Sequence, residues 1–388
     1  MKRASMRTGA AITAAAVLTT LLPALAGAES SEDLKRAAVF ESSRSPLSSG
    51  YSLDGLISSI NAVGSSDQVV GGLTRNSDFP KKLDQAALTA EAPSVLKVEE
   101  DTRPGVQRWH IISPAMGRVV EVQVIPATDL SKPAPMLYLL DGVDAAADSE
   151  WFTEGEIDQF FREKHVTVVL PTEAPGSLYL DWHADDEALG RNMWETFLTQ
   201  ELPPLLENHE TLNFNGKRGI GGLSMGAAGA VTLANRNPEL YDGVFGISGC
   251  YSHTTPAGEI MVRNIVETRG GDLDNLYGPD RERRSREFDV EADPSGLEDM
   301  AVYLATSQGA ASEADRLRFA NVPAQILVLG MVLEQGSHSC TMALDEAMQD
   351  AGMTHQKVEI RRDGFHYWPT FNLYVGPAWD HIKPALYE

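Results

Sequence analysis

The stretch GIGGLSMGAAGA, residues 219–230, places a serine between two glycines where one sequence pattern gives way to another. KRGIGG before it is typical of a buried strand, and AAGAVTLANRN after it is typical of a helix. A nucleophile raised above a sheet needs so tight a turn that flanking side chains would collide, and Gly222 and Gly226 remove those side chains. The pattern alone also occurs in glycine-rich turns without catalytic meaning, but between a strand and a helix it predicts a nucleophile elbow with Ser224 at its tip.

Strand and helix patterns alternate on both sides of this elbow. Two alternating segments around SPAMGR, VQRWHII and VVEVQVIPA, predict an antiparallel hairpin. Near-continuous apolar runs predict strands buried on both faces of a parallel sheet, and amphipathic segments between them predict helices. The predicted strands of this kind include PMLYLLDG (135–142), VTVVLPTE (166–173), YDGVFGISG (241–249) and AQILVLGM (324–331), with KVEIRRDG (357–364) as the last strand. Residues 100–388 are therefore expected to form one α/β domain.

A serine hydroxyl is a poor nucleophile unless a base accepts its proton, and in this fold the histidine follows the serine and the acid along the chain. His366 lies in the loop GFHYW directly after the last predicted strand, where such a sheet delivers an imidazole to the serine. His338 is the main rival because it is close to the candidate acid. We predict His366 as the base.

The acid that orients the histidine is expected in a loop at the same edge of the sheet. Glu334 follows the apolar run AQILVLGM, which places it in the loop after a predicted strand. Asp345 and Glu346 fall in the next predicted helix, where an exposed charge is the commoner interpretation. The predicted triad is therefore Ser224, Glu334 and His366.

The N-terminus has the pattern of a secretory signal. Lys2, Arg3 and Arg7 precede an apolar run that ends in small residues of the A-x-A type at 24–26 or 26–28. A membrane anchor is the alternative, but Thr19, Thr20 and Pro23 interrupt a run that is shorter than the ~20 apolar residues needed to span a bilayer. We predict a signal peptide over residues 1–28 and an exported protein.

Residues 29–99 are rich in Ser, Gly and Asp, which predicts a loosely ordered extension with at most short helices.

The formal charge of −23 becomes −26 once the three basic residues of the signal are removed. Such an acidic chain is an unsuitable partner for nucleic acid.

Cys250 and Cys340, the two cysteines of this predicted exported chain, are expected to form one disulfide. Both are placed at the carboxyl edge of neighbouring predicted strands. The alternative is two small buried thiols. The spacing lacks the paired clusters of a zinc site, and no metal or cofactor is predicted.

Seven motifs from about Val106 to the C-terminus resemble, in order and spacing, landmarks of the secreted mycolyltransferases, the antigen 85 family with its corynebacterial relatives. They are LYLLDGVDAA, SLYLDWHA, WETFLTQELP, GGLSMG, FGISG, LYGP and FHYW. The resemblance implies an α/β-hydrolase fold, with a mainly parallel, doubly wound sheet and helices on both faces. It also implies transfer of a mycolic acyl chain from trehalose monomycolate to a second trehalose monomycolate, or to cell-wall arabinogalactan, through an acyl-serine.

The resemblance further implies roles for individual residues. Ser224 would be the nucleophile, His366 the base and Glu334 its orienting partner. Backbone N–H groups of Val143 and Met225 would form the oxyanion hole. The residues expected to meet the sugar are Asp141, which would hydrogen-bond trehalose, and Trp368, which would line its pocket.

Two departures from the family pattern concern the acyl acceptor. Asp144 stands where mycobacterial members commonly carry an arginine at the sugar site, and GLSMGAAGA is closer to the elbow of general esterases. The alternatives are therefore a secreted carboxylesterase of the same fold and, outside enzymes, an adhesion or scaffold protein. The expected location is the cell envelope, with peripheral contact to its outer lipid layer and no transmembrane span.

Overall fold

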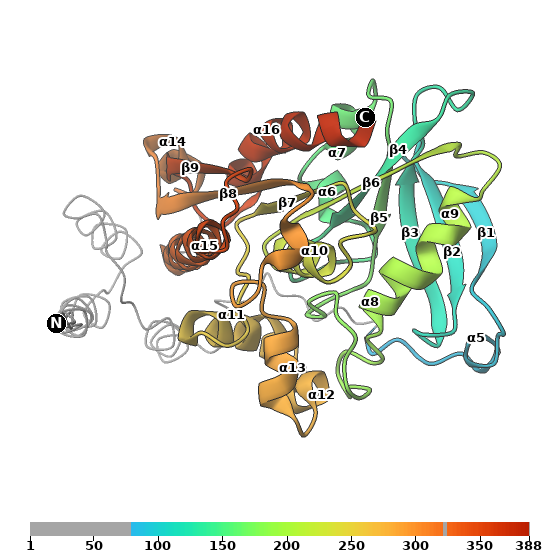
Figure 1. Cartoon of the computed structure of the whole chain (residues 1–388), viewed down its shortest axis with the longest axis horizontal. Helices are drawn as coiled ribbons and strands as arrows, with labels where there is room; N and C mark the ends of the chain where they lie inside the picture. Colours follow the sequence, from blue (N-terminus) through green and yellow to red (C-terminus); the bar gives the residue numbers. More distant parts are fainter. Residues whose placement is uncertain (1–78, 321–323, 388) are drawn as a thin grey trace.

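A nine-stranded sheet runs through the residues that the computed structural model describes, 79–320 and 324–387 (Figure 1). Its order is β1-β2-β3-β5-β4-β6-β7-β8-β9. The first three pairs in this order, β1-β2, β2-β3 and β3-β5, are antiparallel. The remaining pairs, from β5-β4 to β8-β9, are parallel. The strands are β1 (Ser94–Glu100), β2 (Gln107–Ser113), β3 (Arg118–Ile125), β4 (Ala134–Leu140), β5 (Thr167–Pro171), β6 (Phe214–Leu223), β7 (Gly243–Ile247), β8 (Ala301–Ala310) and β9 (Lys357–Asp363).

The apolar character of the strands decides where each one lies. The central strands β4, β5 and β7 are buried along their whole length, as expected for parallel strands covered on both faces. In β4, Met136, Tyr138 and Leu140 pack into one core and the alternate residues Leu137 and Leu139 into the other. The predicted hairpin is confirmed as β2 and β3.

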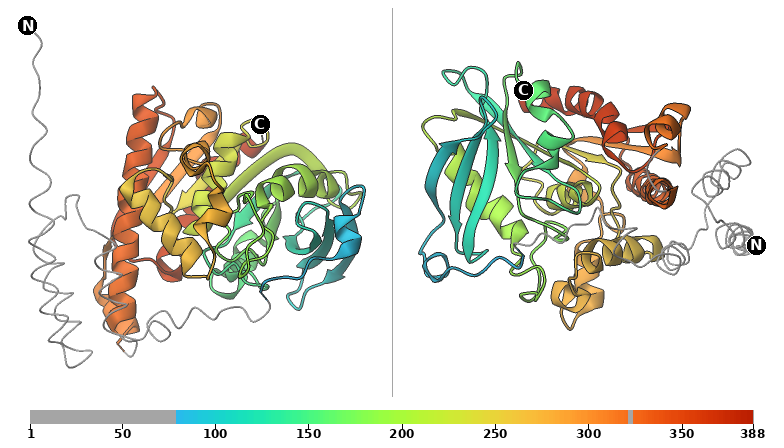
Figure 2. Two further views of the ribbon diagram at one scale, coloured as in Figure 1. Left: turned by 90° about the horizontal axis from the view of Figure 1, so that it is seen from below. Right: turned by 180° about the vertical axis from the view of Figure 1, so that it is seen from behind.

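Helices cover both faces of this sheet (Figures 1 and 2). One core contains side chains of α9, α10 and α15, and the other contains side chains of α6, α7 and α16. A π-helical turn, Phe197–Glu201, joins α8 to α9, and a short 3-10 turn spans Ser295–Leu297. The α-helices are α5 (Gln85–Leu88), α6 (Glu150–Thr153), α7 (Ile157–Phe161), α8 (Trp194–Thr196), α9 (Leu202–Glu207), α10 (Met225–Arg236), α11 (Pro256–Glu267), α12 (Leu273–Tyr277), α13 (Arg281–Glu287), α14 (Glu313–Arg318), α15 (Ala324–Asp350) and α16 (Trp368–Tyr387).

Two expectations from the sequence are wrong, one about a strand and one about where the ordered domain begins. AQILVLGM is not a strand but the beginning of α15, and the strand between β7 and β9 is β8. The ordered domain also begins before residue 100, because β1 starts at Ser94 and pairs with β2. The predicted signal peptide (1–28) and the extension up to residue 78 lie outside the described residues.

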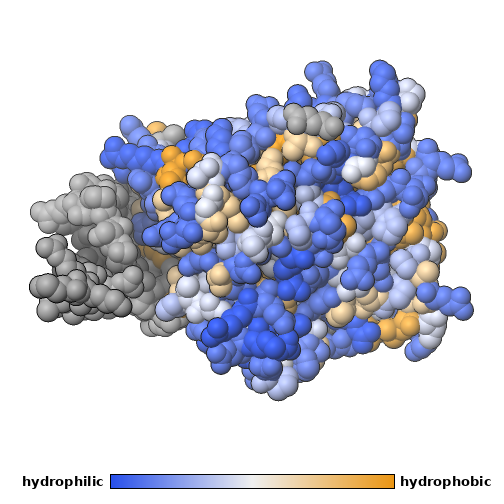
Figure 3. Space-filling model, in the orientation of Figure 1, coloured by the Kyte–Doolittle hydropathy of each residue, from blue (hydrophilic) through white to orange (hydrophobic). Residues whose placement is uncertain are grey.

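The register of β4 and β6 brings the elbow to the carboxyl edge of the sheet. Leu140 pairs with Gly222, so the chain after β4 and Ser224 leave the sheet side by side. Among the described residues, no helix is both long enough and apolar enough to cross a bilayer. The face drawn in Figure 3 is mostly hydrophilic, with small separate hydrophobic patches.

Candidate active site

Ser224 occupies a strained turn between β6 and α10. Its φ of 53° and ψ of −121° lie in a region that a residue with a side chain rarely adopts, at a cost of roughly 1–3 kcal/mol. A Cβ on Gly222 would lie 2.3 Å from the carbonyl carbon of Gly226, and one on Gly226 would lie 2.2 Å from the Leu140 oxygen. Backbone contact on both sides of the serine therefore requires glycine at both positions.

The three side chains predicted to form a triad lie in one hydrogen-bonded row. His366 Nε2 is 2.8 Å from Ser224 Oγ, and His366 Nδ1 is 3.0 Å from Glu334 Oε2. Because a carboxylate only accepts, Nδ1 carries the proton toward Glu334 and Nε2 is left to accept from the serine hydroxyl. Glu334 is fully buried, whereas the imidazole and Ser224 are partly accessible.

Glu334 projects from within α15 rather than from a loop, which corrects the expected position of the acid. Its second oxygen, Oε1, accepts from Ser248 Oγ at 2.8 Å, the Ser307 N–H at 2.7 Å and Thr306 Oγ1 at 3.0 Å. Burial would raise the pKa of Glu334, but hydrogen bonds from His366, Ser307 and Ser248 hold this pKa below its usual range. The carboxylate is thus kept charged in a buried position.

The rival residues lie outside this row. His338 is one helical turn after Glu334, and burial lowers the pKa of its imidazole. Asp345 accepts hydrogen bonds from Gln349 and Gln356, and Glu346 is exposed. Among the described residues, none of these three forms a hydrogen bond or an ion pair with Ser224 or His366.

The amides expected to form an oxyanion hole flank the serine. Met225 is the first residue of α10, so its amide directly follows Ser224 at the positive end of the helix dipole. Val143 follows Gly142, where a Cβ would lie 3.8 Å from Ser224 Cβ, and Gly176 N donates to Val143 O at 3.0 Å. The loop after β4 is therefore held against the elbow.

Asp141 and Trp368, expected at a sugar site, are both buried. Asp141 is 0% exposed, and the nearby Ser149 hydroxyl and α6 amides form no aligned hydrogen bond with its carboxyl oxygens. Burial raises the pKa of Asp141 from 3.8 to about 8, against a smaller lowering by Ser149. Trp368 donates from Nε1 to Glu150 Oε2 at 3.2 Å and meets Trp151 edge to face.

A charged cluster of Asp144, Glu150 and Arg269, which sequence reasoning did not identify, lies near the elbow. Arg269, only 8% exposed, places Nη2 2.7 Å from Asp144 Oδ1, two residues beyond Gly142. Burial lowers the pKa of Arg269, which Asp144 opposes, and burial raises the pKa values of Asp144 and Glu150. The unusual Asp144 was the sequence signal here, but its partner is more than a hundred residues away.

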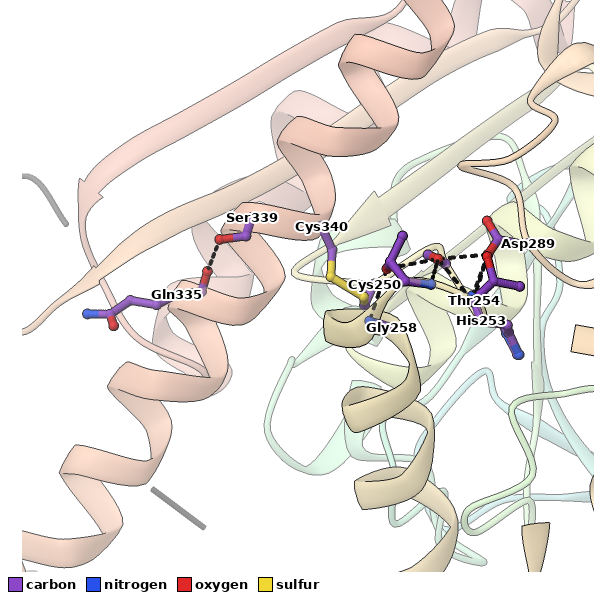
Figure 4. The surroundings of a disulfide bond; sticks show 10 residues. Cys250, His253, Thr254, Gly258, Asp289, Gln335, Ser339 and Cys340 are labelled. Carbon is purple, nitrogen blue, oxygen red and sulfur yellow. Dashed lines mark hydrogen bonds between the residues drawn. A yellow bond between two sulfur atoms is a disulfide. The ribbon is translucent and has the colours of Figure 1, made fainter. Parts of the chain in front are cut away.

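The predicted disulfide between Cys250 and Cys340 is present, with an S–S distance of 2.06 Å and a Cα–Cα distance of 4.8 Å. Figure 4 shows it joining α15 to the segment that leads from β7 toward α11. Cys340 lies in the helix and not after a strand, six residues or about one and a half turns beyond Glu334. The disulfide therefore fastens the helix that carries Glu334.

These groups together suit acyl transfer through a covalent serine: a nucleophile, a base held by a buried acid, and a helix N-terminus that follows the nucleophile. Within residues 79–320 and 324–387, no group of three or more His, Cys, Asp or Glu side chains is placed to hold a metal ion.

Sequence comparison identifies relatives with acyl-transfer names. Residues 113–373 match the model of the family described as "Putative esterase". Diacylglycerol acyltransferase/mycolyltransferase Ag85A of Mycobacterium leprae is 27% identical over 301 residues, covering 75% of this chain and 86% of that protein. Ag85B of the same organism is 27% identical over 296 residues, covering 74% and 85%. The resemblance noted in the sequence is thus confirmed.

Solved structures share the architecture. Mycobacterium tuberculosis MPT51 (FbpC1) aligns with a TM-score of 0.57 at 22% identity, over 70% of this chain and 96% of that one. An S-formylglutathione hydrolase from Agrobacterium tumefaciens aligns with a TM-score of 0.53 at 19% identity, over 76% and 99%. These likenesses confirm the predicted α/β-hydrolase fold.

Proposed function

This chain belongs to the putative esterase family, and we propose that it is an exported serine acyltransferase. It moves a mycolic acyl chain from trehalose monomycolate to a second trehalose monomycolate or to cell-wall arabinogalactan. The observation that carries the proposal is the hydrogen-bonded row of Ser224, His366 and Glu334 in a chain similar to the Ag85 mycolyltransferases.

In the first half-reaction, His366 Nε2 accepts the Ser224 proton while Oγ attacks the ester carbonyl. The amides of Val143 and Met225 stabilise the oxyanion, and the charged Glu334 stabilises the imidazolium. Collapse of the intermediate breaks the ester bond, and His366 donates its proton to the departing trehalose oxygen, which leaves as a hydroxyl. The second half-reaction reverses these steps with an acceptor hydroxyl, which takes the acyl chain and restores Ser224.

The charged cluster beside the elbow supports a polyol as acceptor. Carboxylates accept hydrogen bonds from hydroxyls and a guanidinium donates to their oxygens, so Asp144, Glu150 and Arg269 can bind several hydroxyls at once. Trp368 would line the same pocket with its indole fixed by Glu150. Asp141 is 0% exposed, so we assign the first sugar contacts to the partly exposed Asp144 and Glu150 and a supporting role to Asp141.

The alternative within enzymes is an exported carboxylesterase that passes the acyl group to water. It is favoured by the family match and by the Asp144–Arg269 ion pair, which neutralises the guanidinium internally. An adhesion or scaffold protein would not need the aligned triad, and rapid labelling of Ser224 by a fluorophosphonate probe would exclude it.

The decisive assay incubates the exported protein with trehalose monomycolate and measures trehalose dimycolate and free mycolic acid by mass spectrometry. Transfer predicts dimycolate formation that Ser224→Ala abolishes, with a loss of at least ~10³-fold. Added trehalose should divert acyl groups from water to sugar. Release of free acid alone, unaffected by trehalose, would instead establish the carboxylesterase.

The N-terminal pattern supports the proposed location in the cell envelope. N-terminal sequencing of the protein from the culture medium or cell wall should find a chain that starts directly after residue 26 or 28. A mature chain that retains Lys2 and Arg3 would contradict export by signal cleavage.

A further inference from the structure

The two neighbours of His366 form an aromatic cluster of their own. The rings of Phe365 and Tyr367 stack with centroids 4.0 Å apart and planes 6° from parallel. Phe319, just beyond α14, packs edge to face against both, at 5.0 Å and 4.8 Å. The imidazole between them makes none of these contacts, because it reaches Ser224 and Glu334 instead.

This aromatic cluster is also tied to the helix that carries the acid. The His366 N–H donates to the Gly330 carbonyl at 3.0 Å, and Gly330 is one turn before Glu334 on α15. A Cβ on Gly330 would lie 2.8 Å from the Phe365 ring, so the ring rests directly on the helix backbone. The loop with the base and the helix with the acid therefore touch through Phe365.

The hydroxyl of Tyr367 links the aromatic cluster to α14. Tyr367 OH donates to Asp315 Oδ1 at 2.8 Å. The other oxygen of Asp315 accepts from the N–H and the hydroxyl of Ser312 in the capping box of α14. Burial, and then Asp315, raises the pKa of Tyr367, so its phenol stays protonated and able to donate.

We propose that Tyr367 is a positioning residue for the base: its bond to Asp315 and its stack on Phe365 hold the 365–367 segment so that the imidazole spans Ser224 and Glu334. Tyr367 touches neither the serine nor the acid in this arrangement, so it acts through His366. The proposal rests on the function proposed above, in which His366 is the base.

The test uses Tyr367→Phe, which keeps the ring stack and removes only the hydroxyl. Pre-steady-state acylation of Ser224 by a p-nitrophenyl ester should slow roughly 10- to 100-fold, the scale of an ~1 Å misplacement of a catalytic group, while KM changes little. The pH profile of acylation should also change, since a loosened imidazole exchanges its contact with the Glu334 carboxylate for water.

Two control variants separate positioning from general stability. Tyr303→Phe removes another tyrosine bond to a carboxylate, from Tyr303 OH to Glu359 Oε2 at 3.0 Å, outside the aromatic cluster. Ser312→Ala removes the hydroxyl of the capping box of α14, but the backbone N–H of residue 312 should still donate to Asp315 Oδ2 and Tyr367 OH should still donate to Oδ1. Both should acylate at the parental rate at temperatures where they remain folded.

Parental acylation kinetics in Tyr367→Phe would overturn the proposal, as would equal losses in Tyr367→Phe and Tyr303→Phe. Failure of the proposed function appears differently, because either the parent protein would form no acyl-enzyme or Ser224→Ala would still form one. Acylation by the phenyl ester also does not depend on which acceptor the enzyme prefers, so a hydrolase and a transferase give the same reading.

Discussion

Two fully buried carboxyl groups lie at the carboxyl edge of this sheet, and their surroundings push their pKa values in opposite directions. Glu334 on α15 accepts hydrogen bonds from the imidazole, three hydroxyls and an amide, and its pKa is held low. Asp141 after β4 has no aligned hydrogen-bond donor for its carboxyl oxygens, and its pKa rises to about 8. Burial is common to both, so the donors decide the charge.

The comparison teaches which buried acid can serve as an electrostatic partner. A charged Glu334 can orient and stabilise an imidazolium, whereas Asp141 is a neutral acid through most of the physiological range. The two carboxyl groups thus differ in role although the sequence presents both as acids that follow apolar runs.

The largest expected effect comes from removing the charge of Glu334. Glu334→Gln should lower kcat for phenyl-ester turnover by roughly 10³- to 10⁴-fold, because a neutral amide can neither stabilise the imidazolium nor enforce its tautomer. The matched change Asp345→Asn, on the same helix, should leave kcat unchanged. If Asp345→Asn were the more damaging variant, the assignment of the acid would be wrong.

The second test concerns Asp141 and the pH dependence of stability. Between pH ~4 and pH ~8 the folded protein keeps a proton that the unfolded chain has released, so this group's contribution is complete below its unfolded pKa and is lost as pH rises through its folded pKa. The loss amounts to roughly 5–6 kcal/mol by the pKa difference. Asp141→Asn does not titrate and should therefore gain in Tm over the parent from pH 5 to pH 9.

A constant Tm difference between the two proteins across this pH range would break the comparison, because it would mean that Asp141 ionises as readily as an exposed acid. Activity of Asp141→Asn at pH 6 should remain within a few-fold of the parent if the group is neutral there.

The third test asks whether the disulfide serves the Glu334 side in particular. The bond closes a sequence separation of 90 residues, for which the chain-entropy model gives roughly 4–5 kcal/mol, reduced by any strain. Replacing Cys250 and Cys340 by alanine should lower Tm and also lower kcat, because α15 loses its tether near the acid. Peptide mapping without reductant checks the bond, and two alkylatable thiols in the folded exported protein would refute it.

The smallest expected effect sharpens the role of the donors around Glu334. Ser248→Ala removes one of the hydroxyls on Oε1 and should cost about 1–2 kcal/mol in stability and a few-fold in kcat. Unfolding in urea followed from pH 7 to pH 4 measures it: with fewer donors, the pKa of Glu334 should rise and stability should fall at a higher pH. An unchanged acid limb would mean that Ser248 is dispensable.

Sequence reasoning predicted most of the sheet but assigned the strand between β7 and β9 to the wrong residues. Strands such as β4 and β7 are uniformly apolar and short, so their pattern is unambiguous. AQILVLGM is equally apolar, and such a run cannot distinguish a buried strand from a packed helix by periodicity. The true strand β8 contains Thr306 and Ser307, two polar residues that donate hydrogen bonds to Glu334, and they interrupt the apolar pattern by which a buried strand is recognised.

The same reasoning found the three residues of the row but not what surrounds them. Ser224 and His366 are recognisable because a local pattern places each one at a strand end. Glu334 was chosen on a wrong element and still meets His366, since α15 continues past the edge where a loop was expected. Arg269 could not be found because its partner Asp144 is distant in sequence and only the folded chain joins them.

Glu334 lies within a helix of 27 residues, and this position affects how the protein loses activity on heating. A loop opens on its own many times for each unfolding of the domain, whereas the interior of a long packed helix opens cooperatively with its core. Side chains of α15 belong to the main core, and the helix lies along the edge of the molecule in Figure 2. Loss of turnover and loss of folded protein should therefore follow one curve with temperature, without a folded but inactive form between them.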